Sequence, residues 1–183
     1  MSTKTVSNRN EPLIENRDQL VAAIAKGEKP KDRWRIGTEH EKFVYCRKNF
    51  NAPSYDEPGG IRDLLMALTE FGWSPVMEGD NVIAMSGPDG AVSLEPAGQL
   101  ELSGAPLENL HQTCAETGRH LAQVKAIGEK TGKGFLGMGL WPDKTREELP
   151  IMPKGRYAIM LRHMPRVGSM GLDMMLRTCT IQV

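Results

Sequence analysis

The chain has 183 residues, enough for one domain with a sizeable core, and its 23 basic residues balance its 23 acidic residues. This balance argues against a general nucleic-acid-binding surface, which would carry a basic excess. No apolar run approaches the roughly 20 residues of a membrane span, and the N-terminus lacks the features of a signal or transit peptide. The three cysteines form no metal-binding or disulfide pattern, so we expect a cytoplasmic protein.

The first part of the chain predicts an arm, a helix and a strand. Residues 1–12 are polar and patternless, which is typical of a loose arm. Asn16 is suited to cap a helix, with Gln19 as its capping-box partner, and apolar residues then recur at helical spacing. A strand is expected over residues 34–45.

The middle of the chain predicts a helix followed by β structure. Apolar spacing indicates an amphipathic helix over residues 61–71. Strands are expected at 81–86 and 91–95, joined by the turn composition of 87–90. A further short strand is expected at 99–103.

The last part predicts a long helix and three shorter elements. The helix runs from Pro106 to Gly132, with one apolar side formed by Leu107, Leu110, Cys114, Leu121, Val124 and Ile127. A strand at 135–140, a helix at 156–163 and a strand at 176–183 follow. The chain would then end inside that last strand, which favours a truncated product.

The stretch 36–43 places two carboxylates together. Side chains alternate along a strand, so Glu39 and Glu41 point to the same side. Paired carboxylates repel each other, and a hard cation such as Mg²⁺ or Mn²⁺ between them would remove that repulsion. The alternative is a strand edge whose glutamates face water.

Further acidic residues recur on or beside the predicted strands: Glu78, Asp80, Glu95 and Glu101. If these strands neighbour 34–45, the acids converge on one face and could hold more than one Mg²⁺ with a nucleoside triphosphate. In the alternative, about half of them are simply solvated. Lys154 and Arg156 could bind a carboxylate or phosphate, or belong to a basic loop.

Several motifs together resemble the plant and proteobacterial type of glutamate–cysteine ligase. They are GTEHEKF (37–43), MEGDN (77–81), SLEP (93–96), QLELSGAP (99–106), HQTCAE (111–116), IMPKGRY (151–157), GLDMM (171–175) and RTCT (177–180). Their order is that of the family, and the resemblance covers nearly all of Ile36–Val183.

The resemblance implies an α+β fold, with a glutamine-synthetase-like curved, mainly antiparallel sheet and helices packed behind it. It divides the chain into an N-terminal arm and helix (1–33) and a truncated catalytic domain (34–183). It also implies the first step of glutathione biosynthesis. ATP phosphorylates the γ-carboxylate of glutamate, and the amine of cysteine attacks that acyl phosphate. Mg²⁺ and ATP are the implied cofactors, and small molecules are the implied partners.

The resemblance also implies roles for individual residues. Glu39, Glu41 and Glu101 resemble metal ligands, and Gln182 stands near the place of a metal-binding histidine in a related branch. Arg156 resembles the residue that binds the substrate glutamate or the transferred phosphate, and Glu95 and Asp80 are the expected acids of the cofactor site. Ala97 departs from the glycine expected in this motif.

Three hypotheses follow from the resemblance. The chain is the N-terminal fragment of a glutamate–cysteine ligase and is expected to be inactive alone. Alternatively, it is a non-catalytic metal- or glutamate-binding module that needs a separate second half. In the third hypothesis the ligase uses an amine acceptor other than cysteine, because no residue is clearly aimed at a thiol.

Overall fold

The computed structural model of the protein describes residues 13–88 and 90–183, which form two compact units. The first unit ends at Arg35, and the second comprises Ile36–Val183. The predicted loose arm, 1–12, lies outside the described residues. Within 13–88 and 90–183, no helix has the length and apolar character needed to cross a bilayer.

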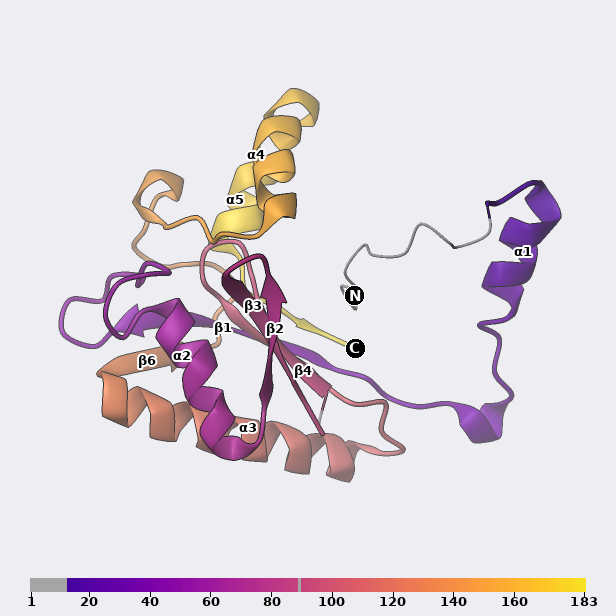
Figure 1. Ribbon diagram of the computed structural model, residues 1–183, viewed down its shortest axis with the longest axis horizontal. Coiled ribbons are helices and arrows are strands. Elements are labelled where there is room, and N and C mark those ends of the chain that lie inside the picture. The colour runs from indigo at the N-terminus through magenta and orange to yellow at the C-terminus, as the bar shows by residue number, and fades with distance from the viewer. Residues whose placement is uncertain (1–12, 89) are drawn as a thin grey trace. The chain divides into compact units, whose positions relative to one another are not determined.

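Between residues 13 and 35, the first unit carries α1 (Arg17–Ala25) and a short 3-10 turn, η1 (Lys31–Arg33) (Figure 1). The predicted cap is confirmed, since Asn16 Oδ1 accepts a hydrogen bond from the Gln19 amide at 3.0 Å. This bond satisfies an N–H group that a helix leaves unpaired at its start. No residue of α1 is buried, so its apolar side chains do not form a core.

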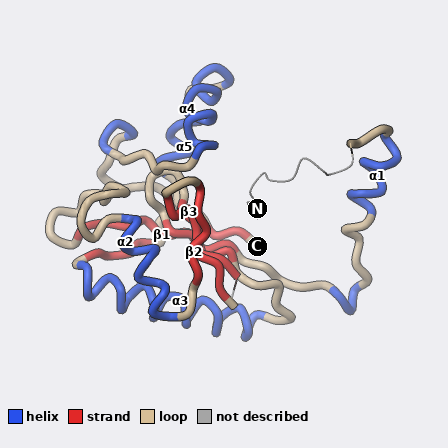
Figure 2. Tube along the Cα trace, viewed as in Figure 1, coloured by secondary structure: helices blue, strands red, loops and turns tan. Residues whose placement is uncertain are grey.

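The second unit is built on a sheet, whose strands are red in Figure 2. The sheet has seven strands, and every pairing among the described residues is antiparallel. The strand order is β2-β3-β4-β5-β1-β6, and β7 also pairs with β1. The strands are β1 (Glu39–Cys46), β2 (Ser74–Glu78), β3 (Asn81–Gly87), β4 (Gly90–Leu94), β5 (Leu100–Ser103), β6 (Lys133–Leu136) and β7 (Ile181–Gln182). Because short turns join antiparallel neighbours, β2 to β5 follow one another as a meander beside β1.

The strands predicted within residues 81–103 are confirmed as β3, β4 and β5. The sequence analysis missed β2, because this exposed edge strand contains Pro75 and shows no apolar alternation. The first predicted strand is too long: before β1 only an isolated bridge joins Ile36 to Leu107. The strand predicted at 135–140 is shifted, since β6 ends at Leu136.

Helices cover one face of this sheet, and Figure 1 shows α3 (Leu110–Thr131) running along it. The predicted helix at 61–71 is confirmed as α2 (Ile61–Ala67) and η2 (Leu68–Phe71). Gly72 ends it with a φ of 85°, a conformation that glycine adopts without steric cost. The main core joins this helix to the sheet through Leu64, Leu65, Leu68, Val92, Leu100 and Leu102.

The long helix α3 starts later than predicted and buries only part of the predicted side. Its N-cap is Asn109, so Pro106 lies before the helix. Part of the predicted apolar side is exposed, namely Leu110, Cys114 and Leu121. The buried side consists of Glu116, His120, Val124, Ile127 and Gly128, so the predicted burial is confirmed at Val124 and Ile127. Glu116 Oε1 accepts a hydrogen bond from the Ala105 amide at 2.8 Å, and this bond holds the polar side of α3 inward.

The C-terminal part contains more helix than the sequence predicts. The helix predicted at 156–163 is confirmed as part of α4 (Gly155–Val167), which follows η3 (Arg146–Glu148). A second helix, α5 (Gly171–Arg177), replaces a predicted link and the start of the predicted last strand, leaving only β7. Two interactions stabilise α5: burial of Met175 and Leu176, and the ion pair between Asp173 and Arg177 at 3.2 Å. The α+β class with a mainly antiparallel sheet is confirmed.

Candidate functional site

The predicted acidic residues of the central strands share one face of the sheet. In the antiparallel register, Glu41 lies opposite Glu101, and Glu101 lies opposite Ser93. Glu39 precedes Glu41 by two positions, and Glu95 follows Ser93 by two, so both lie on the same face as these residues. The predicted adjacency of these strands is therefore confirmed. We call Glu39, Glu41, Glu95 and Glu101 the acidic face.

Hydroxyl groups hold the carboxylates at the centre of this face. Glu101 is only 8% exposed, and its Oε1 accepts hydrogen bonds from Ser103 Oγ at 2.5 Å and from Ser93 Oγ at 3.5 Å. Ser93 Oγ is also 3.1 Å from Glu95 Oε1. A buried carboxylate is costly without such donors, so the serines allow the charge to remain inside the sheet.

The acidic face disfavours full ionisation. Burial raises the pKa of Glu41, and the nearby Glu101 raises it further, while hydrogen bonds from Thr180 oppose the shift. Those bonds run from the Thr180 amide at 2.6 Å and its Oγ1 at 3.3 Å to Glu41 Oε2. Burial also raises the pKa of Glu95, again with a contribution from Glu101. Burial and the neighbouring Glu101 therefore both oppose ionisation of Glu41 and Glu95.

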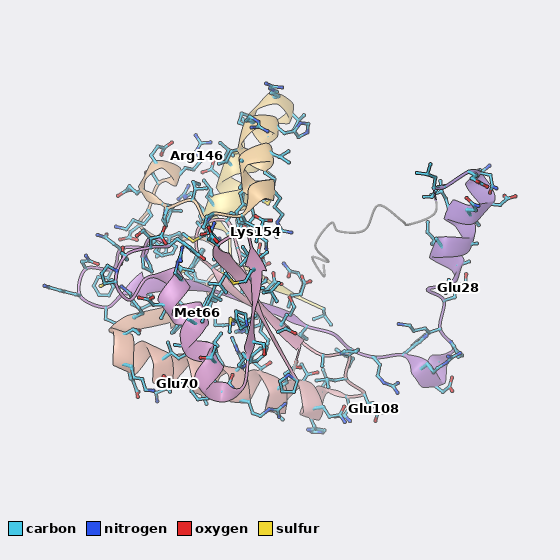
Figure 3. All side chains as sticks on the ribbon, viewed as in Figure 1. Glu28, Met66, Glu70, Glu108, Arg146 and Lys154 are labelled. Atoms are coloured by element: carbon cyan, nitrogen blue, oxygen red, sulfur yellow. The ribbon has the colours of Figure 1, made fainter. Side chains whose placement is uncertain are left out.

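Two cations at the start of α4 approach the acidic face. Arg156 lies 3.6 Å from Glu95 Oε1, and its guanidinium is 5.3 Å from the centre of the Tyr157 ring. Lys154, labelled in Figure 3, is buried and donates from Nζ to the Leu94 carbonyl at 3.2 Å. The Tyr157 hydroxyl donates to the same carbonyl at 2.6 Å. The start of α4 is thus fixed to the end of β4, with Arg156 beside an acidic residue.

The donor chemistry of the acidic face suits a hard cation, because carboxylate oxygens are the ligands that Mg²⁺ prefers. Glu39, Glu41 and Glu101 supply such oxygens from two paired strands. Their side chains do not converge on a single point: within 13–88 and 90–183, no three His, Cys, Asp or Glu side chains form a group able to hold a metal. The residue types therefore fit a magnesium ion, and the predicted ligand roles stay predictions.

The remaining predicted site residues lie at the margins of the sheet. Gln182 lies opposite Glu39 on β7, where it is exposed and donates to the Thr180 hydroxyl. Asp80 is exposed in the turn between β2 and β3, at the edge of the sheet away from β1. The structure therefore brings Gln182 beside the acidic face and leaves Asp80 at the outer hairpin.

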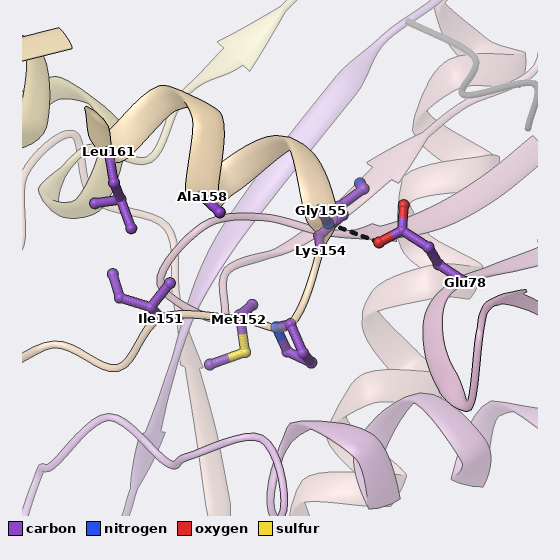
Figure 4. Close-up of a pocket in the computed structure, with 8 residues that line it drawn as sticks. Glu78, Ile151, Met152, Lys154, Gly155, Ala158 and Leu161 are labelled. Carbon is purple, nitrogen blue, oxygen red and sulfur yellow. Dashed lines mark hydrogen bonds between the residues drawn. The ribbon is translucent and has the colours of Figure 1, made fainter. Parts of the chain in front are cut away.

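A pocket of about 370 Å³ lies beside the start of α4 (Figure 4). Its lining is mainly apolar and includes Ile151, Met152, Pro153, Ala158 and Leu161, together with Lys154, Gly155 and Glu78. Glu78 Oε2 accepts a hydrogen bond from the Gly155 amide at 2.6 Å. The sequence analysis noted Glu78 only as one acid among several, since its partner lies 77 residues further along the chain.

On the opposite face of β1, the side chain of Lys42 is buried. Lys42 is 2% exposed, and its Nζ donates to the His40 carbonyl at 2.6 Å and lies 2.8 Å from His40 Nδ1. Burial lowers the pKa of Lys42 to about 8 and that of His120, on α3, to about 3. Neither ring nitrogen of His120 has a hydrogen-bond partner within the described residues. We call His40, Lys42, Val92, Leu100 and Leu102 the closed face.

Comparison with known proteins agrees with the resemblance in the sequence. A family model described as glutamate-cysteine ligase family 2 matches residues 35–183. The chain belongs to this ligase family. A glutamate–cysteine ligase of Brassica juncea, named chloroplastic, is 56% identical over 174 residues, which are 94% of this chain and 33% of the relative. Glutamate–cysteine ligase A of Oryza sativa subsp. japonica is 53% identical over 182 residues, or 99% of this chain and 36% of the relative.

The chain of this ligase family member spans about a third of the length of the curated relatives it matches. The comparison also corrects one prediction. We expected a cytoplasmic protein, but these relatives are named chloroplastic, including one from Arabidopsis thaliana that is 56% identical over 174 residues. The cytoplasmic prediction is therefore wrong. It relied on the cysteine pattern and on an N-terminal sequence that does not resemble a signal or transit peptide.

Proposed function

We propose that this chain forms part of an ATP- and Mg²⁺-dependent ligase that joins the γ-carboxylate of glutamate to the amine of cysteine. The reaction passes through a γ-glutamyl phosphate and is the first step of glutathione synthesis. The observation that carries this proposal is the strand register that sets Glu41 opposite Glu101, on the face that Arg156 approaches. Family membership and the names of the relatives support the same reaction.

In this proposal the acidic face holds the metal. Glu39, Glu41 and Glu101 would be the main ligands, with Gln182 at the margin. Bound Mg²⁺ neutralises phosphate charge and so assists phosphoryl transfer. The raised pKa of Glu41 supports this role, because a cation would relieve the repulsion that contributes to that shift.

Arg156 would bind the anionic substrate group. A guanidinium presents a fork of N–H donors that matches a carboxylate or a phosphate. Glu95 lies 3.6 Å away and would hold the guanidinium in place until the substrate arrives, while its own carboxylate stays near the cofactor. Asp80 keeps its proposed role in the cofactor site only if the β2–β3 hairpin moves toward that site.

The fold proposal is equally specific. We infer that the sheet is the first portion of a glutamine-synthetase-like curved sheet, whose further strands belong to the longer relatives. Antiparallel pairing throughout the sheet and helices on its closed face support this.

The test uses the complete product of the reading frame that encodes this chain. We expect phosphate release from ATP only when Mg²⁺, glutamate and cysteine are all present, and formation of γ-glutamylcysteine in equal amount. Arg156→Ala should lower kcat/KM for glutamate by about 100-fold, the loss expected when a charge-assisted contact is removed. Glu129→Ala, on the exposed side of α3, should leave the rate unchanged.

Three outcomes would contradict the proposal. Phosphate release without glutamate would indicate a different substrate. Equal product with other amines would support the alternative acceptor. Binding of metal and glutamate without any turnover would support the non-catalytic module.

A further inference from the structure

The start of α4 has an unusual cap. The residue at the N-cap position, Lys154, makes no side-chain cap bond, because an ammonium group has no acceptor for a backbone N–H. Its Nζ donates instead to the Leu94 carbonyl. The Gly155 amide donates to Glu78 Oε2 at 2.6 Å, as the dashed line in Figure 4 shows. A carboxylate is well placed here, since the first turn of a helix carries free N–H groups and a partial positive charge.

This cap comes from the far edge of the sheet. Glu78 is the last residue of β2, the outermost strand, and the turn that follows begins at Gly79 with a φ of 58°. The register of β2 and β3 shifts between Val76 and Met77, just before Glu78. Such an irregularity re-aims the side chains that follow it. The outer hairpin is thereby connected to a helix that starts 77 residues later.

The capped turn also carries the cation of the proposed site. Arg156 is one residue after Gly155 and lies 3.6 Å from Glu95. On the other side of the same turn, Lys154 and Tyr157 are bonded to the Leu94 carbonyl. The turn therefore has two attachments, one at the end of β4 and one at Glu78. Loss of the second would let the turn tilt about the first and move the guanidinium.

We propose that Glu78 is a positioning residue for substrate binding, which acts by capping α4 and fixing Arg156 rather than by contacting the substrate. This inference rests on the proposed function, in which Arg156 binds the anionic group of glutamate. Burial lowers the pKa of Lys154 in the same turn, and Glu78 lies close enough to oppose that shift.

The hydrogen bond between Glu78 and the Gly155 amide can be removed by substituting either residue. Glu78→Ala removes the acceptor, whereas Glu78→Gln keeps an oxygen acceptor and removes the charge. Gly155→Pro removes the donor. Proline is favoured at the first position of a helix, and the φ of −117° and ψ of 123° at Lys154 suit a residue before proline.

In the complete enzyme, we expect Glu78→Ala and Gly155→Pro to raise the KM for glutamate by about threefold to tenfold, the effect of one lost helix cap. The kcat should change less than the KM. The KM of the Glu78→Ala, Gly155→Pro double variant should be no higher than that of either single variant. Glu78→Gln should keep a KM for glutamate close to that of the wild type. In an Arg156→Ala background, Glu78→Ala should have no further effect. The matched control is Glu129→Ala, a carboxylate removed from the exposed side of α3.

Two results would overturn the proposal. If Glu78→Gln is as harmful as Glu78→Ala, the charge itself contacts the substrate. If Glu78→Ala lowers the melting temperature without changing KM, the cap serves stability alone.

A second readout does not depend on ligase activity. Amide hydrogen exchange at residues 155–158 should become faster in Glu78→Ala and stay slow in Glu78→Gln. Unchanged exchange would contradict the cap even in a protein with no measurable turnover. Faster exchange in a protein without turnover would instead reject the proposed function and leave the cap standing.

Discussion

The two faces of the sheet at β1 differ in how they accommodate charge. The acidic face carries carboxylates that are held by serine hydroxyls and approached by Arg156. The closed face is packed with apolar side chains, and its one buried cation, Lys42, bonds only to His40 within the described residues. A single alternating strand supplies both faces. Glu39 and Glu41 therefore lie on one face of β1, and His40 and Lys42 lie on the other.

The closed face stabilises the fold, whereas the acidic face carries the candidate site. Hydrophobic burial on the closed face stabilises the fold, since Val92 and Leu102 have no exposed surface. On the acidic face, burial raises the pKa of Glu41 and of Glu95, and repulsion from Glu101 raises both further. Such opposed environments are expected where a protein reserves one surface for a ligand.

The largest expected effect separates a buried leucine from an exposed one. Leu102→Ala should lower the free energy of unfolding by about 2–5 kcal/mol, because it leaves a cavity in the closed face. Leu110→Ala is the matched control: this side chain is 71% exposed on α3, so a change within about 0.5 kcal/mol is expected. Urea unfolding of both variants tests the difference. Equal losses would mean that Leu110 is buried, as predicted from the sequence.

The second prediction concerns pH. Burial lowers the pKa of His120 from 6.5 to about 3, so the unfolded chain binds the proton more readily between these values. Stability should therefore fall as pH decreases from 6.5 toward 3, by at most about 1.4 kcal/mol per pH unit. His120→Leu should remove this loss. Parallel pH profiles for the wild type and the variant would show that His120 titrates normally.

The third prediction perturbs the acidic face. Glu101→Gln keeps an acceptor for Ser103 and removes a charge that raises the pKa of Glu41 and Glu95. The pKa of Glu95 should therefore move down toward its usual value, while the free energy of unfolding changes by less than about 1 kcal/mol. Carboxyl-carbon NMR titration measures the shift. An unchanged pKa of Glu95 would show that the charge of Glu101 does not affect Glu95.

The smallest expected effect lies where β7 joins the acidic face. Thr180→Val removes the 3.3 Å bond from the hydroxyl to Glu41 and keeps the bond from the Thr180 amide. A loss below about 1 kcal/mol is expected in thermal unfolding, because one donor to the carboxylate remains. A loss of unfolding free energy above about 2 kcal/mol would show that the Thr180 hydroxyl, rather than its amide, is the main donor to Glu41.

Local sequence patterns predicted the acidic face well. Alternation within 36–43 and 99–103 placed Glu39, Glu41 and Glu101 on shared faces, and the structure then showed these strands to be neighbours. Strand alternation depends only on backbone geometry, so it can be read from the sequence. For α3, the apolar pattern predicted the burial of Val124 and Ile127 but not that of Glu116, whose hydrogen bond from the Ala105 amide joins residues 11 positions apart.

Other features depend on partners distant in sequence. The cap that Glu78 gives α4 spans 77 positions, and no local pattern indicates it. The helix α5 was missed because its glycine and methionines suggested a link, whereas burial of Met175 and Leu176 stabilises it. Pro75 and the exposed pattern of β2 likewise concealed an edge strand.

If the acidic face is the metal site of a ligase, the protein should bind Mn²⁺ there. Isothermal titration should show Mn²⁺ bound by the wild type and displaced by Mg²⁺. Glu101→Gln should weaken this binding by at least about tenfold, since one of the few proposed ligands is lost. Glu129→Ala should bind as the wild type does. Equal affinity in the wild type and Glu101→Gln would contradict the claim.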